Sequence, residues 1–177
     1  MTGGSIGSGS ALVNLGEALQ PTDRTEEAVS TLTRAARLFR VCGADGYEAR
    51  ASHALGEVLL ALGRAEEAVS AFSRTASLCH GLGDHGREGS TLLGLAAALE
   101  AADRPDEAAI SCAQAATAFE QAGDAPAKGW ALTDLALYCY WRAGPRRRCR
   151  RRMRRWSTTG VWSRTNPSCT RMSWRNP

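Results

Sequence analysis

The sequence predicts an all-α fold in which helical hairpins stack into a solenoid. A phrase of 40 residues occurs three times and begins a fourth time, starting at Ala11, Ala51, Thr91 and Ala131. Within each copy, apolar and small residues recur at three- and four-residue spacing in two blocks, and a polar turn separates the blocks. This pattern predicts two antiparallel helices per copy. Units that repeat in register stack on their neighbours and share one continuous core.

The register assigns the same role to matching residues of the copies. A leucine is followed by glycine or alanine, then by an apolar residue three positions later, and an alanine lies twelve positions after the small residue. Glycine is costly inside a helix, so the small residues predict a close approach of the first helix of each hairpin to the second. The series are Leu15, Leu55, Leu95 and Leu135; Gly16, Gly56, Ala96 and Ala136; Leu19, Leu59, Leu99 and Cys139; and Ala28, Ala68 and Ala108.

The predicted helices begin and end at residues that explain each boundary. We expect helices from Ser10 onward and over 26–40 in the first copy, and over 47–62 and 65–80 in the second. Gly63 supplies a left-handed residue between two helices, and Asp103 holds the same position in the third copy. Pro105 fits an opening turn, Gly43, Gly83 and Gly123 follow second helices, and Asp84 and Asp124 cap the next first helices. The helix dipole favours acidic residues in the first turn of each second helix. These residues are Glu26, Glu27, Glu66, Glu67, Asp106 and Glu107.

The charge is distributed unevenly along the 177 residues. The net charge is +4, but residues 1–144 carry 11 Lys and Arg against 18 Asp and Glu, whereas residues 145–177 carry 11 Arg and no acid. We therefore expect a flexible start over 1–9, a repeat array over 10–143, and an Arg-rich tail over 144–177 that is disordered or out of frame. The array comprises copies at 11–50, 51–90 and 91–130 and a partial copy at 131–143.

The cysteines and the N-terminal sequence favour a soluble cytoplasmic protein. The first ten residues lack the charged start and apolar run of a signal peptide, and no later segment is apolar enough to span a bilayer. No CxxC pair occurs, and two cysteines take positions that are apolar in other copies. We expect reduced thiols that fill the core. The six cysteines are Cys42, Cys79, Cys112, Cys139, Cys149 and Cys169.

The pattern of each copy resembles the tetratricopeptide repeat, over residues 10–143. The matching residues are Leu55, Gly56, Leu59, Ala68, Phe72 and Thr75 in the second copy; Leu15, Gly16, Leu19, Ala28, Leu32 and Ala35 in the first; and Leu95, Ala96, Leu99, Ala108, Cys112 and Ala115 in the third. The period of 40 instead of 34 and the missing closing proline resemble the long-helix variety of kinesin light chains and many bacterial regulators. The resemblance implies a right-handed α-solenoid that acts as a protein or peptide interaction scaffold, as a fragment of a larger bacterial regulator. No motif in the sequence supports an enzyme or a cofactor, so we expect neither.

The resemblance also implies where a partner binds. Proteins of this family usually bind peptides or proteins on the concave face of the first helices, beside the Leu-Gly pair. Trp130 is the strongest individual candidate, because large aromatic residues are frequent hot spots. The corresponding positions are Asn14, Glu17, Arg50, His53, Glu57, Leu93, Glu100, Trp130, Asp134 and Leu137.

Three motifs that suggest other chemistry are set aside. Residues 81–86 match GxGxxG, but they lie between two predicted helices without the strand that dinucleotide binding requires. Residues 3–7 match GxSxG, again without a strand. Cys79, His80 and His85 are close in sequence but lack a fourth ligand and a tetrahedral template, so no metal site is predicted.

The Arg-rich segment 146–155 falls where the fourth second helix is due. The core positions of that helix, 148, 152 and 155, are all Arg. Burying each unpaired charge costs on the order of several kcal/mol. One hypothesis is a frameshift, because plausible G/C-rich codons read one base earlier give Glu-Ala-Leu where the first and second copies have Glu-Ala-Val. A second is a basic tail that binds nucleic acid or another anionic surface, with Trp156, Trp162 and Trp174 for stacking. A third is an uninformative linker.

The segment Trp130 to Trp141 is apolar on nearly all sides. A terminal helix of a repeat array normally has a polar outer face. We therefore expect an exposed apolar patch at this helix, and self-association through it.

Overall fold

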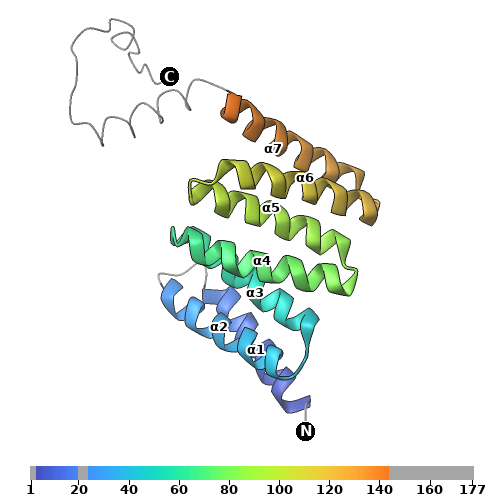
Figure 1. Ribbon diagram of the computed structural model, residues 1–177. Helices are drawn as coiled ribbons and strands as arrows, with labels where there is room; N and C mark the ends of the chain where they lie inside the picture. Colours follow the sequence, from blue (N-terminus) through green and yellow to red (C-terminus); the bar gives the residue numbers. More distant parts are fainter. Residues whose placement is uncertain (1–2, 20–23, 144–177) are drawn as a thin grey trace, which may run out of the picture. The chain divides into compact units, whose positions relative to one another are not determined.

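The structure is a computed structural model that describes residues 3–19 and 24–143. These ranges form seven helices and contain no strand (Figure 1), and short turns join the helices from α2 onward. They are α1 (Gly3–Leu19), α2 (Thr25–Val41), α3 (Asp45–Ala61), α4 (Ala65–Leu82), α5 (His85–Ala101), α6 (Pro105–Ala122) and α7 (Ala125–Ala143). The predicted all-α class is confirmed. None of the described helices is both long and apolar enough to cross a membrane.

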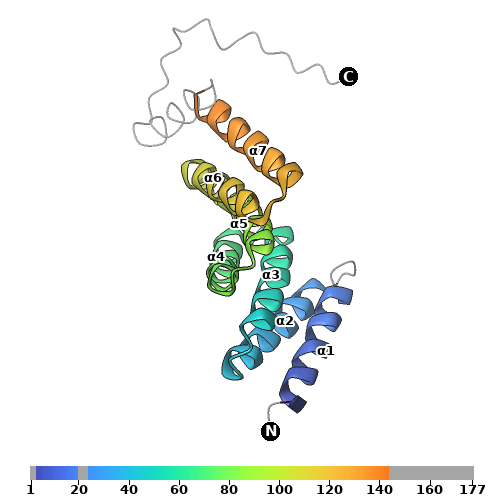
Figure 2. The same ribbon diagram turned by 90° about the vertical axis from the view of Figure 1, so that its right-hand side faces the viewer.

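The helices form successive hairpins within the compact unit Met1–Tyr140. We call α1, α3, α5 and α7 the A helices, and α2, α4 and α6 the B helices. The B helix α2 packs against α1 and α3, and α4 packs against α3 and α5. The B helix α6 packs against α5. Contacts also join α1 to α3 and α3 to α5, so A helices are neighbours across the repeats. Figure 2 shows α4 and α6 on one side of the array and α3 and α5 on the other.

The predicted boundaries agree with the structure to within two residues for α2, α3 and α4. The start of α1 is a correction, because the helix begins at Gly3 and not at Ser10. The first turns of α1 pack on the core, although their glycine-rich composition does not indicate it. Gly9 is buried so closely against Phe39 that a Cβ there would lie 2.6 Å from the ring, and Ile6 packs on the same core. A glycine-rich start is therefore compatible with a helix here, because a larger residue would not fit.

The turns between helices use the residues that the sequence indicates. Gly63 follows α3 with φ of 74°, and Asp103 follows α5 at the equivalent position with φ of 63°. Asp is one of the few residues other than glycine that tolerate this conformation. The Asp84 and Asp124 carboxylates accept hydrogen bonds from the backbone N–H of Arg87 and Ala127 at 3.1 and 3.0 Å, so both predicted caps of A helices are confirmed.

The close approach of A and B helices occurs at two levels of each hairpin. At the first level a Cβ on Gly16 would lie 2.6 Å from Leu32, and a Cβ on Gly56 would lie 2.9 Å from the Phe72 ring. The third copy instead holds Ala96 and the smaller Cys112, both buried in one cluster. Where the A helix has no side chain, the B helix is large, and where it has a methyl group, the B helix is small. The predicted reason for the small residues is confirmed.

The second level lies seven residues earlier on the A helix and seven later on the B helix. A Cβ on Gly89 would lie 2.8 Å from Phe119, which repeats the arrangement of Gly9 and Phe39. In the second copy the same two positions are Ala49 and Cys79, and both are fully buried. Small and large residues are therefore matched at both levels and in all three hairpins.

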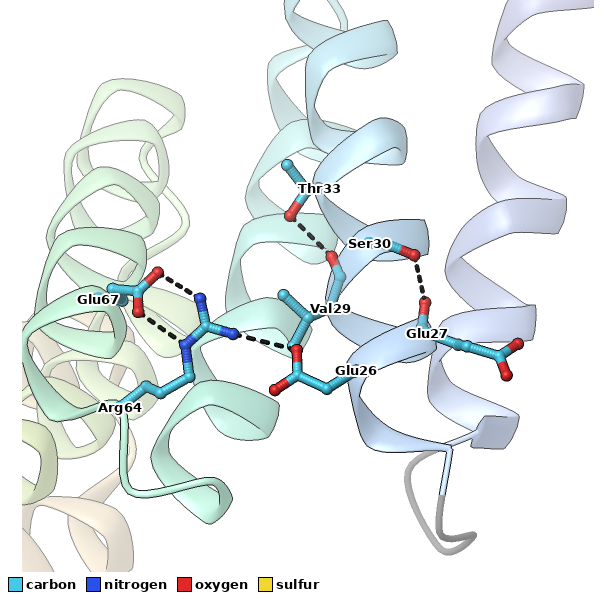
Figure 3. Close-up of polar contacts among 7 residues, drawn as sticks. All are labelled: Glu26, Glu27, Val29, Ser30, Thr33, Arg64 and Glu67. Atoms are coloured by element: carbon cyan, nitrogen blue, oxygen red, sulfur yellow. Dashed lines mark hydrogen bonds and ion pairs between the residues drawn. The ribbon is translucent and has the colours of Figure 1, made fainter.

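The acidic first turns of the B helices are ion-paired to an arginine that recurs every 40 residues. Arg64 donates from Nε to Glu67 at 2.7 Å and from Nη1 to Glu26 of the preceding repeat at 3.2 Å (Figure 3). Arg104 makes the same two contacts one repeat later, with Glu107 and Glu66. Solvent screens these exposed groups, so each pair contributes little to stability. Their regularity links the N-terminal end of each B helix to the next.

A second set of ion pairs joins each B helix to the A helix that follows it. The carboxylate of Glu48 is buried, and it accepts from Arg40 Nε at 2.9 Å and from Arg74 Nε at 3.0 Å. One repeat later His80 contacts Glu88, and two repeats later Lys128 contacts Glu120 at 2.9 Å. In the last pair the acid lies on the B helix and the base on the A helix, so each junction keeps one acidic and one basic residue in contact.

The cysteines divide into buried and accessible thiols. Cys79 and Cys112 are buried, and burial raises the pKa of both thiols, that of Cys112 to about 11, so they are neutral core groups as predicted. The prediction is wrong for Cys139, which is exposed. The side of α7 that carries Cys139 is not covered by a helix within the described residues. Cys149, Cys169 and the tail hypotheses lie outside the described residues.

The Gly56 contact predicts an unusual response to a glycine-to-alanine substitution. Gly56→Ala should lower the free energy of unfolding by about 1–2 kcal/mol, because the Phe72 ring also lies 2.9 Å from a Cβ position at Gly94 and cannot retreat toward α5. Urea unfolding measures the change. Gly81→Ala is the matched control, because a Cβ there meets nothing within 4 Å, and should stabilise the chain by up to about 1 kcal/mol. Equal effects of the two substitutions would contradict this explanation.

The buried Glu48 predicts a pH-dependent contribution to stability. Burial opposes ionisation, but the bonds from Arg74 and Arg40 outweigh it and hold the pKa of Glu48 below its ordinary 4.5. Glu48→Gln should therefore cost about 1–3 kcal/mol at neutral pH, and the difference from wild type should vanish as the pH falls through the lowered pKa. Glu120→Gln removes the exposed equivalent and should cost less than about 1 kcal/mol. Denaturant unfolding at several pH values measures this cost. A cost for Glu48→Gln that does not change with pH would contradict the account.

Candidate functional site

The predicted partner-binding residues are distributed over all four A helices. Asn14 and Glu17 lie in α1, and Arg50, His53 and Glu57 lie in α3. The remaining five lie in α5 and α7, and they are Leu93, Glu100, Trp130, Asp134 and Leu137. We call these ten residues the groove set.

The polar members on α1 and α3 are bound to one another. Arg50 donates from Nη2 to Glu17 Oε2 at 2.9 Å and to Asn14 Oδ1 at 3.1 Å, while its Nε contacts Glu17 Oε1 at 3.3 Å. The guanidinium therefore holds the carboxylate with both edges of its fork. Both side chains remain about half exposed. This cluster links α1 to α3 and presents a nearly neutral surface.

His53 is enclosed between α3, α4 and α5. Its Nδ1 lies 3.2 Å from the Thr91 hydroxyl, its Nε2 lies 3.6 Å from Glu57, and its ring meets the edge of Phe72 at 5.5 Å. Burial lowers the pKa of His53 below its ordinary 6.5; Glu57 opposes the shift and Arg87 adds to it. The imidazole is therefore neutral at physiological pH, and it acts as a packing and hydrogen-bonding group.

On α5 and α7 the predicted residues differ in exposure. Leu93 is partly buried in the core, and Glu100 accepts a hydrogen bond from the Tyr138 hydroxyl of α7 at 3.1 Å. Burial and the neighbouring Glu100 raise the pKa of Tyr138, so the hydroxyl stays protonated and can donate this bond. In contrast, Trp130 is 68% exposed and Leu137 is 50% exposed. These two side chains are seven residues apart and lie on the same side of the helix.

An exposed apolar surface at α7 is therefore present, as the sequence predicts. Leu132 is also 46% exposed, and Ala136 and Cys139 are exposed beside it. Successive residues of an α-helix are rotated by about 100°, so Leu132, Ala136 and Cys139 lie on a different side of α7 from Trp130 and Leu137. The side chains of residues 140 and 141 lie outside the part that the structure describes.

Two shallow hollows lie away from the groove set. One is lined by α4, α5 and α6 and includes His80, Glu88 and Gln114. The other lies between α4, α5 and α6 near Ile110. Both are wide open, and neither includes a member of the groove set.

The motifs that were set aside have ordinary structural roles. Residues 81–86 span the end of α4 and the start of α5, with no strand before them, and residues 3–7 lie within α1. His80 and His85 both direct Nδ1 to the Glu88 carboxylate, at 2.9 and 3.1 Å, while Cys79 is buried. Among the described residues, no three His, Cys, Asp or Glu side chains converge to hold a metal ion.

Comparison with known proteins identifies the repeat. Residues 8–79, which span α1 to α4, match the family model of the tetratricopeptide repeat. Over these residues the chain is similar to tetratricopeptide repeats. A solved structure of nearly identical TPR-like repeats, ascribed to a kinesin light chain of Podosopora anserina, aligns with a TM-score of 0.54 and 16% identity, over 86% of this chain and 97% of that one. It is among 23 solved chains that match. No curated protein sequence matches.

The repeat accounts for the arrangement of the groove set. Tetratricopeptide repeats generally mediate protein–protein interaction, and such scaffolds are typically not enzymes. Sequence reasoning found the A-helix positions but missed their partners Thr91 and Tyr138. Each of these lies 38 residues after the residue it contacts, two residues short of one repeat. Comparing every polar residue with that offset would have found both contacts.

The environment of His53 predicts how its titration responds to its neighbours. NMR of the imidazole protons should give a pKa below 6.5 in the folded chain. Glu57→Gln should lower this pKa further, because the carboxylate favours the imidazolium, whereas Arg87→Gln should raise it. If both substitutions move the pKa in the same direction, the charges of these side chains are not its determinants.

Proposed function

We propose that the chain binds a protein or peptide partner on the face of its A helices that carries the groove set. The observation that supports this most is the exposure of Trp130 and Leu137 on one side of α7. Aromatic residues on interaction surfaces contribute much of the binding free energy, since they bury a large area with little loss of side-chain entropy. The A helices α1, α3 and α5 are also neighbours across the repeats, and Tyr138 of α7 donates a hydrogen bond to Glu100 of α5, so positions on successive A helices lie near one another.

The contacts within the groove set favour a partner that binds through apolar side chains. Arg50 and Glu17 neutralise one another, and the His53 imidazole is neutral. Glu100 already accepts a bond from Tyr138. Breaking these pairs would leave groups without hydrogen-bond partners, so charged ligands gain little here. A peptide with one large apolar residue directed at Trp130 and Leu137, and a polar remainder, suits this surface best.

A test of this proposal uses peptides selected on the wild-type chain from a displayed random library. Trp130→Ala should weaken the binding of the selected peptides by about 2 kcal/mol, roughly 30-fold, as measured by calorimetry. The Leu137→Ala substitution should weaken it by about tenfold.

The matched control is Ile110→Ala, which removes an apolar side chain of similar exposure from the B helix α6. It should leave the affinity unchanged. Peptides that depend on Ile110 and not on Trp130 would place the binding surface on the B helices and refute the proposal.

A further inference from the structure

The first junction between a B helix and the next A helix shows how the repeat neutralises a buried carboxylate. Glu48 of α3 lies between Arg40 of α2 and Arg74 of α4. Its Oε1 accepts a hydrogen bond from Nε of each arginine, and its Oε2 accepts one from Nη2 of Arg74 at 3.2 Å. The carboxylate therefore binds two guanidinium groups, one from each neighbouring B helix.

The second junction keeps the glutamate but has neither arginine. Forty residues later the glutamate is Glu88, the first arginine is replaced by His80, and the second is replaced by Gln114. His80 contacts Oε1 of Glu88 at 2.9 Å, and His85 contacts Oε2 at 3.1 Å. Among the described residues, no arginine or lysine forms an ion pair with Glu88. Histidine can be uncharged whereas arginine cannot, so this junction keeps the negative charge without the two permanent positive charges.

The open hollow between α4, α5 and α6 lies at this second junction. Its volume is about 550 Å³, and Glu88 and Gln114 both line it. The Glu88 side chain is only 13% exposed, so its carboxylate lies deep in the hollow. We call this space the Glu88 hollow. The other residues that line it are Ala76, Ser77, His80, Leu92, Thr117, Ala118 and Gln121.

We propose that the Glu88 hollow binds an arginine side chain of a partner peptide, whose guanidinium takes the place that Arg74 has beside Glu48. Each carboxylate oxygen has two lone pairs, and the histidines use one on each oxygen, so both oxygens of Glu88 can accept a further bond. Oε1 of Glu48 accepts two donors at once in the same position. A guanidinium donates two parallel bonds to a carboxylate, whereas an ammonium is a single point charge.

The charge and the shape of the hollow both favour this ligand. Glu88 is the only acid that lines it, and no lysine or arginine does, so one guanidinium balances the charge. Its floor is apolar, because Leu92 lies where the first junction has Ser52, and this surface suits the methylene stem of an arginine. The hydroxyl and amide groups around the hollow can bond to the peptide backbone on either side of that arginine.

NMR titration of the full chain with the peptide acetyl-Ala-Arg-Ala-amide tests the site. The methyl signals of Leu92, on the floor of the hollow, report binding. Low salt and pH 8 limit screening and favour uncharged histidine. The arginine peptide should shift these signals. The same peptide with citrulline, which has the shape of arginine without its charge, should bind about tenfold more weakly. No shift with the arginine peptide, or equal affinity for the two peptides, would overturn the proposal.

Gln114→Arg gives the second junction the arginine of the first. The new guanidinium should bond to Glu88, so the arginine peptide should bind about tenfold more weakly, and the thermal midpoint of unfolding should rise. Ala113→Arg is the matched control, because it adds the same charge to α6 at an exposed position outside the hollow. It should leave both properties nearly unchanged. Peptide binding that is as strong in Gln114→Arg as in the control would overturn the proposal.

Two further variants separate this site from the proposed function. Glu88→Gln keeps the size of the side chain and removes its charge, so it should abolish binding of the arginine peptide. Trp130→Ala should leave that binding unchanged, and Gln114→Arg should leave unchanged the affinity for peptides selected through Trp130. Loss of both kinds of binding in Trp130→Ala or in Gln114→Arg would mean that the two sites are one, and would overturn the separate hollow.

Discussion

The structure depends on the match in size between facing residues of the A and B helices. At each of two levels per hairpin, a glycine faces a large apolar side chain or an alanine faces a cysteine. This arrangement sets the helix separation, because helices approach more closely where one of them has no Cβ. It also explains why glycine persists inside α1, α3 and α5 despite its conformational cost. A change at either partner is felt by the other, so the pair and not the single residue is the unit of the repeat.

The polar contacts also recur from repeat to repeat, but the residues that make them vary more. Arg64 and Arg104 each link two consecutive B helices, and an acidic residue contacts a basic residue at each junction where a B helix meets the next A helix. At the last junction the acid and the base exchange places, as Glu120 and Lys128 show. The size of each residue is therefore constrained at the buried contacts, whereas the surface pairs require only that one residue is acidic and the other basic. The difference follows from physics, since a surface pair needs opposite signs while a buried contact needs a defined volume.

Much of this fold could be predicted from the sequence because its information is local and repeated. The spacing of apolar residues gave the helices, and Gly63, Asp103, Asp84 and Asp124 gave their ends. The start of α1 could not be predicted, because a run of glycines indicates a flexible chain until Phe39 is known to lie against Gly9. Likewise, the groove positions could be placed by register, but not the pairing of Arg50 with Glu17 or the burial of His53. Those depend on the distance between neighbouring repeats, which no single repeat contains.

The last described A helix brings these points together. In α5 one side packs on the core, one side receives a B helix, and one side carries the groove-set residues Leu93 and Glu100. In α7 the first of these sides is buried through Ala127 and Ala131, while the other two are exposed. The exposed sides differ in character: Gly129 and Ala136 are small and suited to a close helix, whereas Trp130 and Leu137 are large. Because the repeat assigns a distinct geometry to each side, the two exposed sides of α7 suit different kinds of contact.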